Sequence, residues 1–140
     1  MTEFVFGSYR MEVDVEATRA WYDAYGDATG GCDCLYCQNF AAAVGTLPPE
    51  VGAFLEPLGL DLNKPGDASE CGPAEGGRLY LPIYHVAGRL LETGKEPLEP
   101  APGVSAWFTT DMGPFLRDFP EPFFQCCISM VLPWLLEEEL

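Results

Sequence analysis

The stretch that decides the fold is Phe123-Phe124-Gln125-Cys126-Cys127-Ile128-Ser129-Met130-Val131-Leu132, which Pro133-Trp134 follows. Successive side chains of a β-strand point to opposite faces of its sheet. One face of this segment is therefore wholly apolar (Phe124, Cys126, Ile128, Met130, Leu132 and Trp134), and the other carries Phe123, Gln125, Cys127, Ser129 and Val131. The pattern predicts a strand whose apolar face, with Cys126 at its centre, packs on the core.

Two earlier segments also have the period of strands. Residues 78–91 are apolar on both sides, which indicates a strand covered on both faces, and Pro82 within it implies an edge position or a bulge. Residues 104–110 predict a short strand. The segments between them, 61–77 and 93–103, are rich in glycine, proline and acidic residues and are typical of surface loops.

The first half of the chain predicts a hairpin and then three helices. Residues 4–6 and 9–13 read as two strands around a Gly7-Ser8 turn. Asp14 can cap a helix that ends near Gly26, and a second helix begins around Cys34 or Leu35. The third begins at Pro48-Pro49, has its last turn truncated or kinked by Pro57, and forms an αα-hairpin with the second.

The order of these elements indicates the fold class. Strands segregated from helices predict an α+β fold, in which helices cover a mostly antiparallel sheet. We expect about five strands, including the N-terminal hairpin, with the three helices packed on one face. No linker divides the sequence, so residues 1–140 are expected to form one domain.

The charge balance argues against several partners. The 140 residues include 22 acidic and 7 basic side chains, for a net charge of −15. The basic residues are scattered singly, whereas a nucleic-acid backbone or an anionic membrane surface attracts clustered Lys and Arg. We therefore expect neither partner. No apolar run is long enough to span a membrane and no secretory signal is visible, which predicts a cytoplasmic protein with reduced or metal-bound cysteines.

Three of the six cysteines lie in what we call the cysteine segment, residues 30–40. It contains Cys32-Asp33-Cys34-Leu35-Tyr36-Cys37, and a C-x-x-C pair is half of a common zinc site. Zinc requires four ligands, for which Cys71 and His85 are the remaining candidates. The hypothesis is a structural zinc bound by Cys32, Cys34, Cys37 and either Cys71 or His85.

Two further interpretations of the cysteine segment stay open. Cys34 at a helix N-terminus, with Cys37 three residues on, is the placement of a reactive dithiol. However, no strand is predicted before the motif, and Asp33 opposes thiol ionisation. The simplest interpretation is that the cysteines are small apolar side chains where a loop tucks under a helix, held there by Tyr36, Asn39 and Phe40.

The remaining residues supply little catalytic chemistry. There is one histidine, His85, in an apolar strand, and the sequence has neither a nucleophile elbow nor a phosphate-binding loop. Catalysis is therefore not expected, and no catalytic or cofactor-binding residue is assigned. The leading hypothesis is a non-enzymatic cytoplasmic domain that binds a partner protein or a small ligand, with a homodimer through sheet edges or aromatic surface as one form of it.

Several motifs together resemble a family of small bacterial proteins without an assigned activity, found mainly in anaerobic Firmicutes. They are Cys32-Asp33-Cys34-Leu35-Tyr36-Cys37-Gln38-Asn39-Phe40, Phe54-Leu55, Leu58-Gly59-Leu60-Asp61, Lys64-Pro65, Tyr80, Tyr84-His85-Val86-Ala87-Gly88 and Leu132-Pro133-Trp134. The resemblance implies no catalytic residues. Some relatives have a further C-x-x-C before the His85 stretch, where this chain has Tyr80-Leu81-Pro82-Ile83, and this difference argues against a four-thiolate zinc site here.

Overall fold

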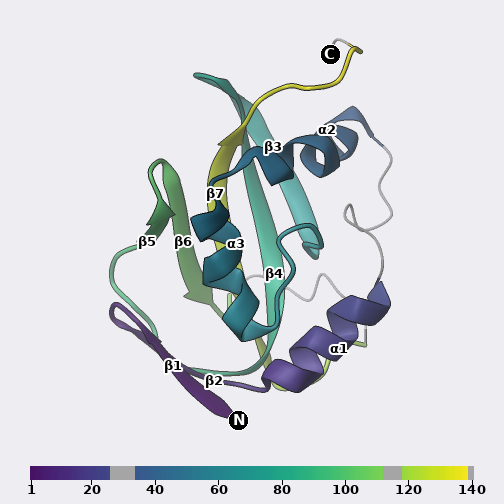
Figure 1. Ribbon diagram of the computed structural model, residues 1–140. Coiled ribbons are helices and arrows are strands. Elements are labelled where there is room, and N and C mark those ends of the chain that lie inside the picture. Colours follow the sequence, from purple (N-terminus) through teal and green to yellow (C-terminus); the bar gives the residue numbers. More distant parts are fainter. Residues whose placement is uncertain (26–33, 112–117, 139–140) are drawn as a thin grey trace.

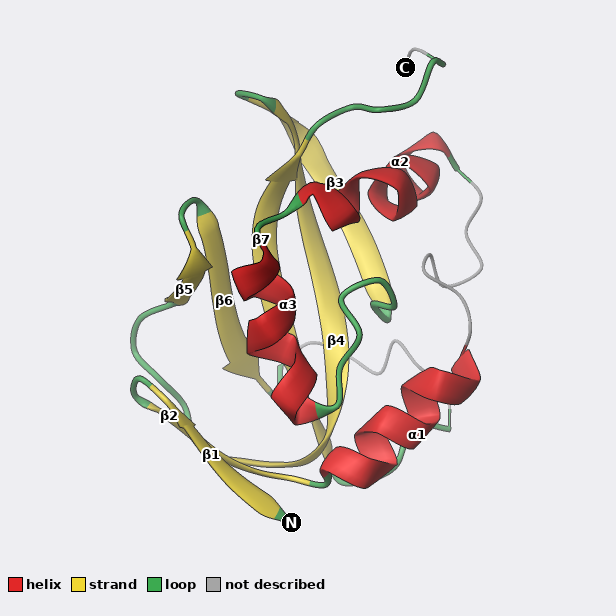
Figure 2. Ribbon diagram, in the orientation of Figure 1, coloured by secondary structure: helices red, strands yellow, loops and turns green. Residues whose placement is uncertain are grey.

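A computed structural model describes residues 1–25, 34–111 and 118–138. The strands are β1 (Thr2–Phe6), β2 (Tyr9–Val13), β3 (Asp67–Ala74), β4 (Gly77–Glu92), β5 (Leu98–Ala101), β6 (Val104–Thr109) and β7 (Phe123–Leu132). The helices are α1 (Val15–Tyr25), α2 (Leu35–Ala43) and α3 (Pro49–Leu55), with short 3-10 turns η1 (Val44–Thr46) and η2 (Glu56–Leu58). Figure 2 shows α3 in front of a curved sheet, with α2 at the upper right and α1 at the lower right.

One antiparallel sheet contains all the strands. Its order is β1-β2-β4-β7-β6-β5, and β3 pairs with β4 beside this path. The 16-residue β4 is long enough to pair with β3 at its beginning, with β2 at its end and with β7 along its other side (Figure 1). The rest of the fold is therefore arranged around β4 and β7.

The alternation predicted for β7 is confirmed. Phe124, Cys126, Ile128, Met130 and Leu132 are all fully buried and belong to one hydrophobic core. Helices α2 and α3 cover this face, since each places a phenylalanine ring against an aromatic ring of the sheet. The ring centroids of Phe40 and Tyr80 lie 5.8 Å apart, and those of Phe54 and Phe108 lie 6.0 Å apart. Burial of such rings is the main favourable term in folding.

The α+β class, the antiparallel sheet and the three helices are confirmed, but the predicted number of strands is wrong. Among the described residues, the sheet has seven strands instead of about five. The additional strands, β3 and β5, lie in the two segments that we expected to be loops, 61–77 and 93–103. Both segments are rich in polar residues and contain proline, and among the described strands β3 and β5 each have one neighbour. Pairing with that neighbour therefore overrides a weak intrinsic preference for the β conformation.

The predicted helix boundaries follow local rules. The Asp14 carboxylate accepts a hydrogen bond from the Ala17 amide (3.0 Å) and caps α1. α3 begins with Pro49, and its last turn, which contains Pro57, narrows to the 3-10 turn η2. The short connection between α2 and α3 is also as expected. Among the described residues, no helix has the length and apolar character needed to cross a membrane.

Helix α1 takes a position that the sequence did not predict. Strands β3 and β2 pair with the same side of β4, but between them no strand of the described part of the chain pairs with residues 84–87 of that side. We call this interval the open edge of β4. α1 lies along it, whereas α2 and α3 lie over the face of the sheet. The expectation that all three helices pack on one face therefore holds for α2 and α3 only.

Side chains of α1 complete the backbone hydrogen bonds of the open edge. The Tyr22 hydroxyl donates to the His85 carbonyl (3.1 Å) and accepts from the His85 amide (2.8 Å). One turn earlier, the Thr18 hydroxyl accepts from the Ala87 amide (3.1 Å), and the Ala87 carbonyl accepts from the Asp14 amide (2.8 Å). Residues four apart lie on one helix face, so Thr18 and Tyr22 together satisfy backbone groups that water cannot reach.

We predict that the two hydroxyls contribute separately to stability. Tyr22→Phe removes the hydroxyl that pairs with the His85 amide and carbonyl, and we expect a loss of about 2–4 kcal/mol in the free energy of unfolding. Thr18→Val leaves the Ala87 amide unpaired and should cost about 1–3 kcal/mol. Urea denaturation followed by circular dichroism measures both losses. The exposed Thr93 provides the control, because Thr93→Val should change stability by less than about 0.5 kcal/mol. Equal stabilities for all three variants would contradict this role for α1.

Candidate functional site

The cysteine segment begins α2 as predicted. Cys34 is the N-cap residue, with extended backbone (φ −67°, ψ 163°), and its carbonyl accepts the first helical hydrogen bond from Gln38 (2.9 Å). Cys34 is exposed and Cys37 is half-buried. Cys32 lies outside the described residues.

Asn39 joins this helix to the sheet and to the chain that follows β7. Its buried side-chain amide donates to the Pro133 carbonyl (3.0 Å) and to the Tyr80 hydroxyl (3.4 Å), and its oxygen accepts from the Leu135 amide (2.7 Å). The Tyr80 hydroxyl in turn donates to the Tyr36 carbonyl (2.9 Å). Tyr36, Asn39 and Phe40 thus have the packing role that the simplest interpretation expected, but the exposed Cys34 is not the apolar filler that it expected.

The described metal-binding candidates do not form a metal site. Cys71 lies exposed on β3, and His85 lies on the opposite face of β4 from Tyr80, which contacts α2. Within residues 1–25, 34–111 and 118–138, no three His, Cys, Asp or Glu side chains come together around a common point. Because Cys32 is outside these ranges, the zinc hypothesis stays a prediction.

His85 is sealed within the protein. Its side chain is fully buried, with its ring centroid 5.4 Å from that of Phe119 and 5.1 Å from that of Phe123. Burial disfavours the charged imidazolium and lowers the pKa of His85 to about 4. The only histidine of the chain is therefore neutral at pH 7 and out of reach of a substrate in solvent.

This lowered pKa makes stability depend on pH. An unfolded histidine binds a proton near pH 6.5, whereas folded His85 binds one only near pH 4, so the unfolded state holds more protons between these values. Acidification from about pH 7 to about pH 5 should therefore reduce the free energy of unfolding by about 2 kcal/mol through this residue. Chemical denaturation at the two pH values measures the loss, and His85→Leu should lack it. The same loss in His85→Leu would assign the effect to other groups.

The two cysteines of β7 differ from those on the surface. Cys126 and Cys127 point to opposite faces of the strand, as predicted, and both are fully buried. Burial raises the pKa of Cys127 to about 11 and that of Cys126 well above its usual value. Neither thiol ionises at neutral pH, so neither can act as a nucleophile.

We predict that the exposed cysteines react with iodoacetamide at neutral pH before the buried ones. Cys71 and Cys34 are exposed and should be alkylated in the folded protein, whereas Cys126 and Cys127 should react only after unfolding. Peptide mass spectrometry after timed quenching measures the order. Fast modification of Cys126 would contradict its burial. Protection of Cys34 that a chelator removes would instead favour the zinc hypothesis.

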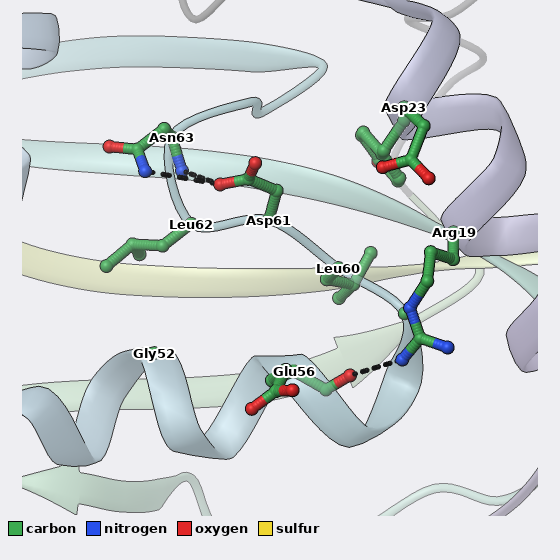
Figure 3. Close-up of a pocket in the computed structure, with 10 residues that line it drawn as sticks. Arg19, Asp23, Gly52, Glu56, Leu60, Asp61, Leu62 and Asn63 are labelled. Carbon is green, nitrogen blue, oxygen red and sulfur yellow. Dashed lines mark hydrogen bonds between the residues drawn. The ribbon is translucent and has the colours of Figure 1, made fainter.

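A cleft of about 440 Å³ lies between α1, the α3–η2 segment and the turn that follows it (Figure 3). We call this the α1 cleft. Its lining consists of Arg19, Tyr22, Asp23, Gly52, Glu56, Gly59, Leu60, Asp61, Leu62 and Asn63. The volume is within the range of small-molecule sites.

Close packing at Gly59 sets the shape of the α1 cleft. Gly59 ends η2 with φ 87°, and a Cβ atom there would lie 2.7 Å from the Val15 carbonyl oxygen of α1. Only glycine allows this approach in that conformation. The next residues then turn along α1, where the Lys64 ammonium donates to the Tyr22 carbonyl (2.8 Å) and the Tyr84 hydroxyl donates to the Leu62 carbonyl (2.6 Å).

Charged side chains of both signs surround the α1 cleft. Arg19 and Asp23 are four residues apart on α1 and point to the same side, as Figure 3 shows. Asp61 lies on the turn with its carboxylate directed toward Asn63, and Glu56 lies on η2. Arg19 donates one hydrogen bond to the Glu56 carbonyl (3.4 Å), but in the described part of the chain no carboxylate lies within ion-pair distance of its guanidinium.

Two features of the sequence belong to the α1 cleft. Arg19 and Asp23 share the polar face of α1, and Gly52 places a residue without a side chain in the middle of α3. Neither feature indicates a site until the position of α1 at the edge of β4 is known.

Comparisons with known proteins do not extend this description. No protein-family model, curated protein or solved structure matches the chain. Function is therefore argued from the geometry alone.

Proposed function

We propose that this protein is a non-enzymatic binding domain and that the α1 cleft holds a small polar ligand. The observation that carries the proposal is a concave site of about 440 Å³, bordered by charges that do not neutralise one another. Ligand sites typically combine such a hollow with a few polar groups that fix orientation. Leu60 and Leu62 supply apolar lining, and Arg19, Asp23 and Asp61 supply the polar groups.

The chemistry of the lining favours binding over catalysis. The described residues of the lining include no thiol, no histidine and no serine or threonine hydroxyl. The Tyr22 hydroxyl is engaged with the backbone of His85, and the His85 ring is buried between phenylalanines. A nucleophile with an adjacent base, the usual arrangement for covalent catalysis, is thus missing from this set of residues.

We also propose that the protein acts in the cytoplasm. Cys71 is exposed on β3 and takes part in no disulfide with a described residue. An exposed thiol persists in a reducing compartment, whereas oxidising compartments favour its conversion to a disulfide.

A thermal-shift screen with matched variants tests the proposed site. A Cβ atom built on Gly52 or on Gly45 meets no atom within 4 Å, so both positions have room for a leucine, but only Gly52 lines the α1 cleft. We expect Gly52→Leu to fill the cleft and Gly45→Leu to leave it open. The panel consists of small amines, amino acids, carboxylates, sugars and nucleosides.

We expect at least one class of compound to raise the melting temperature of the wild type and of Gly45→Leu. At about a hundredfold excess over Kd, the rise should be about 9 °C. Gly52→Leu should not respond. A response of Gly52→Leu equal to that of the wild type, or no response of the wild type to any class, would contradict the proposal.

A further inference from the structure

We infer that the α1 cleft binds a cationic amino acid, a ligand with one carboxylate and two positively charged groups. This inference rests on the proposed binding function and specifies its ligand class. Its basis is the charge pattern of the lining: one guanidinium, from Arg19, and three carboxylates, from Asp23, Glu56 and Asp61.

The guanidinium of Arg19 fits the carboxylate of the ligand. Only its Nη2 atom has a hydrogen-bond partner in the described structure, the Glu56 carbonyl at 3.4 Å. The other N–H donors of the guanidinium are left for a ligand, and a planar guanidinium binds a carboxylate through two parallel hydrogen bonds. Arg19 is exposed at the rim, so a ligand reaches it without displacing an internal ion pair.

The carboxylates of Asp23 and Asp61 fit an ammonium group. Figure 3 shows Asp23 and Asp61 on opposite sides of the cleft, on α1 and on the turn respectively. The Oδ1 atom of Asp61 accepts from the amide (2.9 Å) and the side chain (3.2 Å) of Asn63, and these bonds fix the orientation of the carboxylate. Its Oδ2 atom has no hydrogen-bond partner among the described residues and can accept from a ligand.

Glu56, Leu60 and Leu62 fit the second positively charged group of the ligand and the methylene groups that connect its charged ends. Glu56 is exposed on η2 and adds a third negative charge, so the four charged lining groups sum to −2. A ligand with net positive charge complements this sum, and the net charge of −15 of the whole chain attracts such a ligand over a distance. Leu60 and Leu62 offer apolar contact to methylene groups between the charged ends.

Isothermal titration calorimetry with three probes at equal ionic strength tests this inference. L-Lysine carries both kinds of charge, cadaverine carries only the two ammonium groups, and glutarate carries only carboxylates. We expect L-lysine to bind most tightly. Cadaverine should bind roughly tenfold or more weakly, because it lacks the carboxylate that accepts a charge-assisted hydrogen bond from Arg19. Glutarate should not bind, because the carboxylates of the lining repel it.

Variants of exposed residues assign the contacts. Arg19→Gln should weaken L-lysine by roughly tenfold or more and leave cadaverine unchanged. Asp23→Asn should weaken both probes. Tight binding of glutarate, equal binding of L-lysine and cadaverine with no effect of Arg19→Gln, or no binding of L-lysine would each overturn the inferred ligand class.

The Gly52→Leu and Gly45→Leu variants separate this inference from the proposed function. If another compound binds the wild type and Gly45→Leu but not Gly52→Leu, the α1 cleft is the site and only the ligand class is wrong. If L-lysine binds Gly52→Leu as tightly as it binds the wild type, the α1 cleft is not the site, and the proposed function and the ligand class both fail.

Discussion

The interaction on which the rest of the structure depends is the contact between two hydroxyls of α1 and the backbone of β4. The Tyr22 hydroxyl donates a hydrogen bond to the His85 carbonyl and accepts one from the His85 amide, and the Thr18 hydroxyl accepts one from the Ala87 amide. A neighbouring strand would normally satisfy these groups. Here a helix replaces it for one interval, so β4 can serve as a partner of β3, α1 and β2 in succession. A buried edge without these hydroxyls would leave backbone groups unpaired, which natural proteins rarely tolerate.

The same contact creates the α1 cleft. With Thr18 and Tyr22 turned toward β4, the neighbouring positions of α1 that carry Arg19 and Asp23 face the turn after η2 (Figure 3). Gly59 lets that turn approach the helix closely. The binding proposal and the fold therefore have a common physical origin: the helix uses one side for backbone hydrogen bonds and presents its charged side to the cleft.

The parts of the structure that local rules determine could be predicted from the sequence. The alternation of apolar side chains predicts β7. The Asp14 cap and the prolines predict helix boundaries, and Tyr36, Asn39 and Phe40 are the predicted residues that hold the beginning of α2 in place. β3 and β5 could not be predicted, because their polar segments become strands only by pairing with others. The α1 cleft could not be predicted either, since a hydroxyl shows no preference for a strand edge until the helix and the strand are placed together.

Amide hydrogen exchange followed by NMR tests the role of α1 most directly. The amides of His85 and Ala87 donate to hydroxyls of α1 instead of to any described strand, yet we predict that both are protected as strongly as the amides of β7. In Tyr22→Phe, the His85 amide should lose protection while the Ala87 amide keeps it. Fast exchange of both amides in the wild-type protein, or unchanged protection of His85 in Tyr22→Phe, would contradict the claim that α1 takes the place of a strand at the open edge of β4.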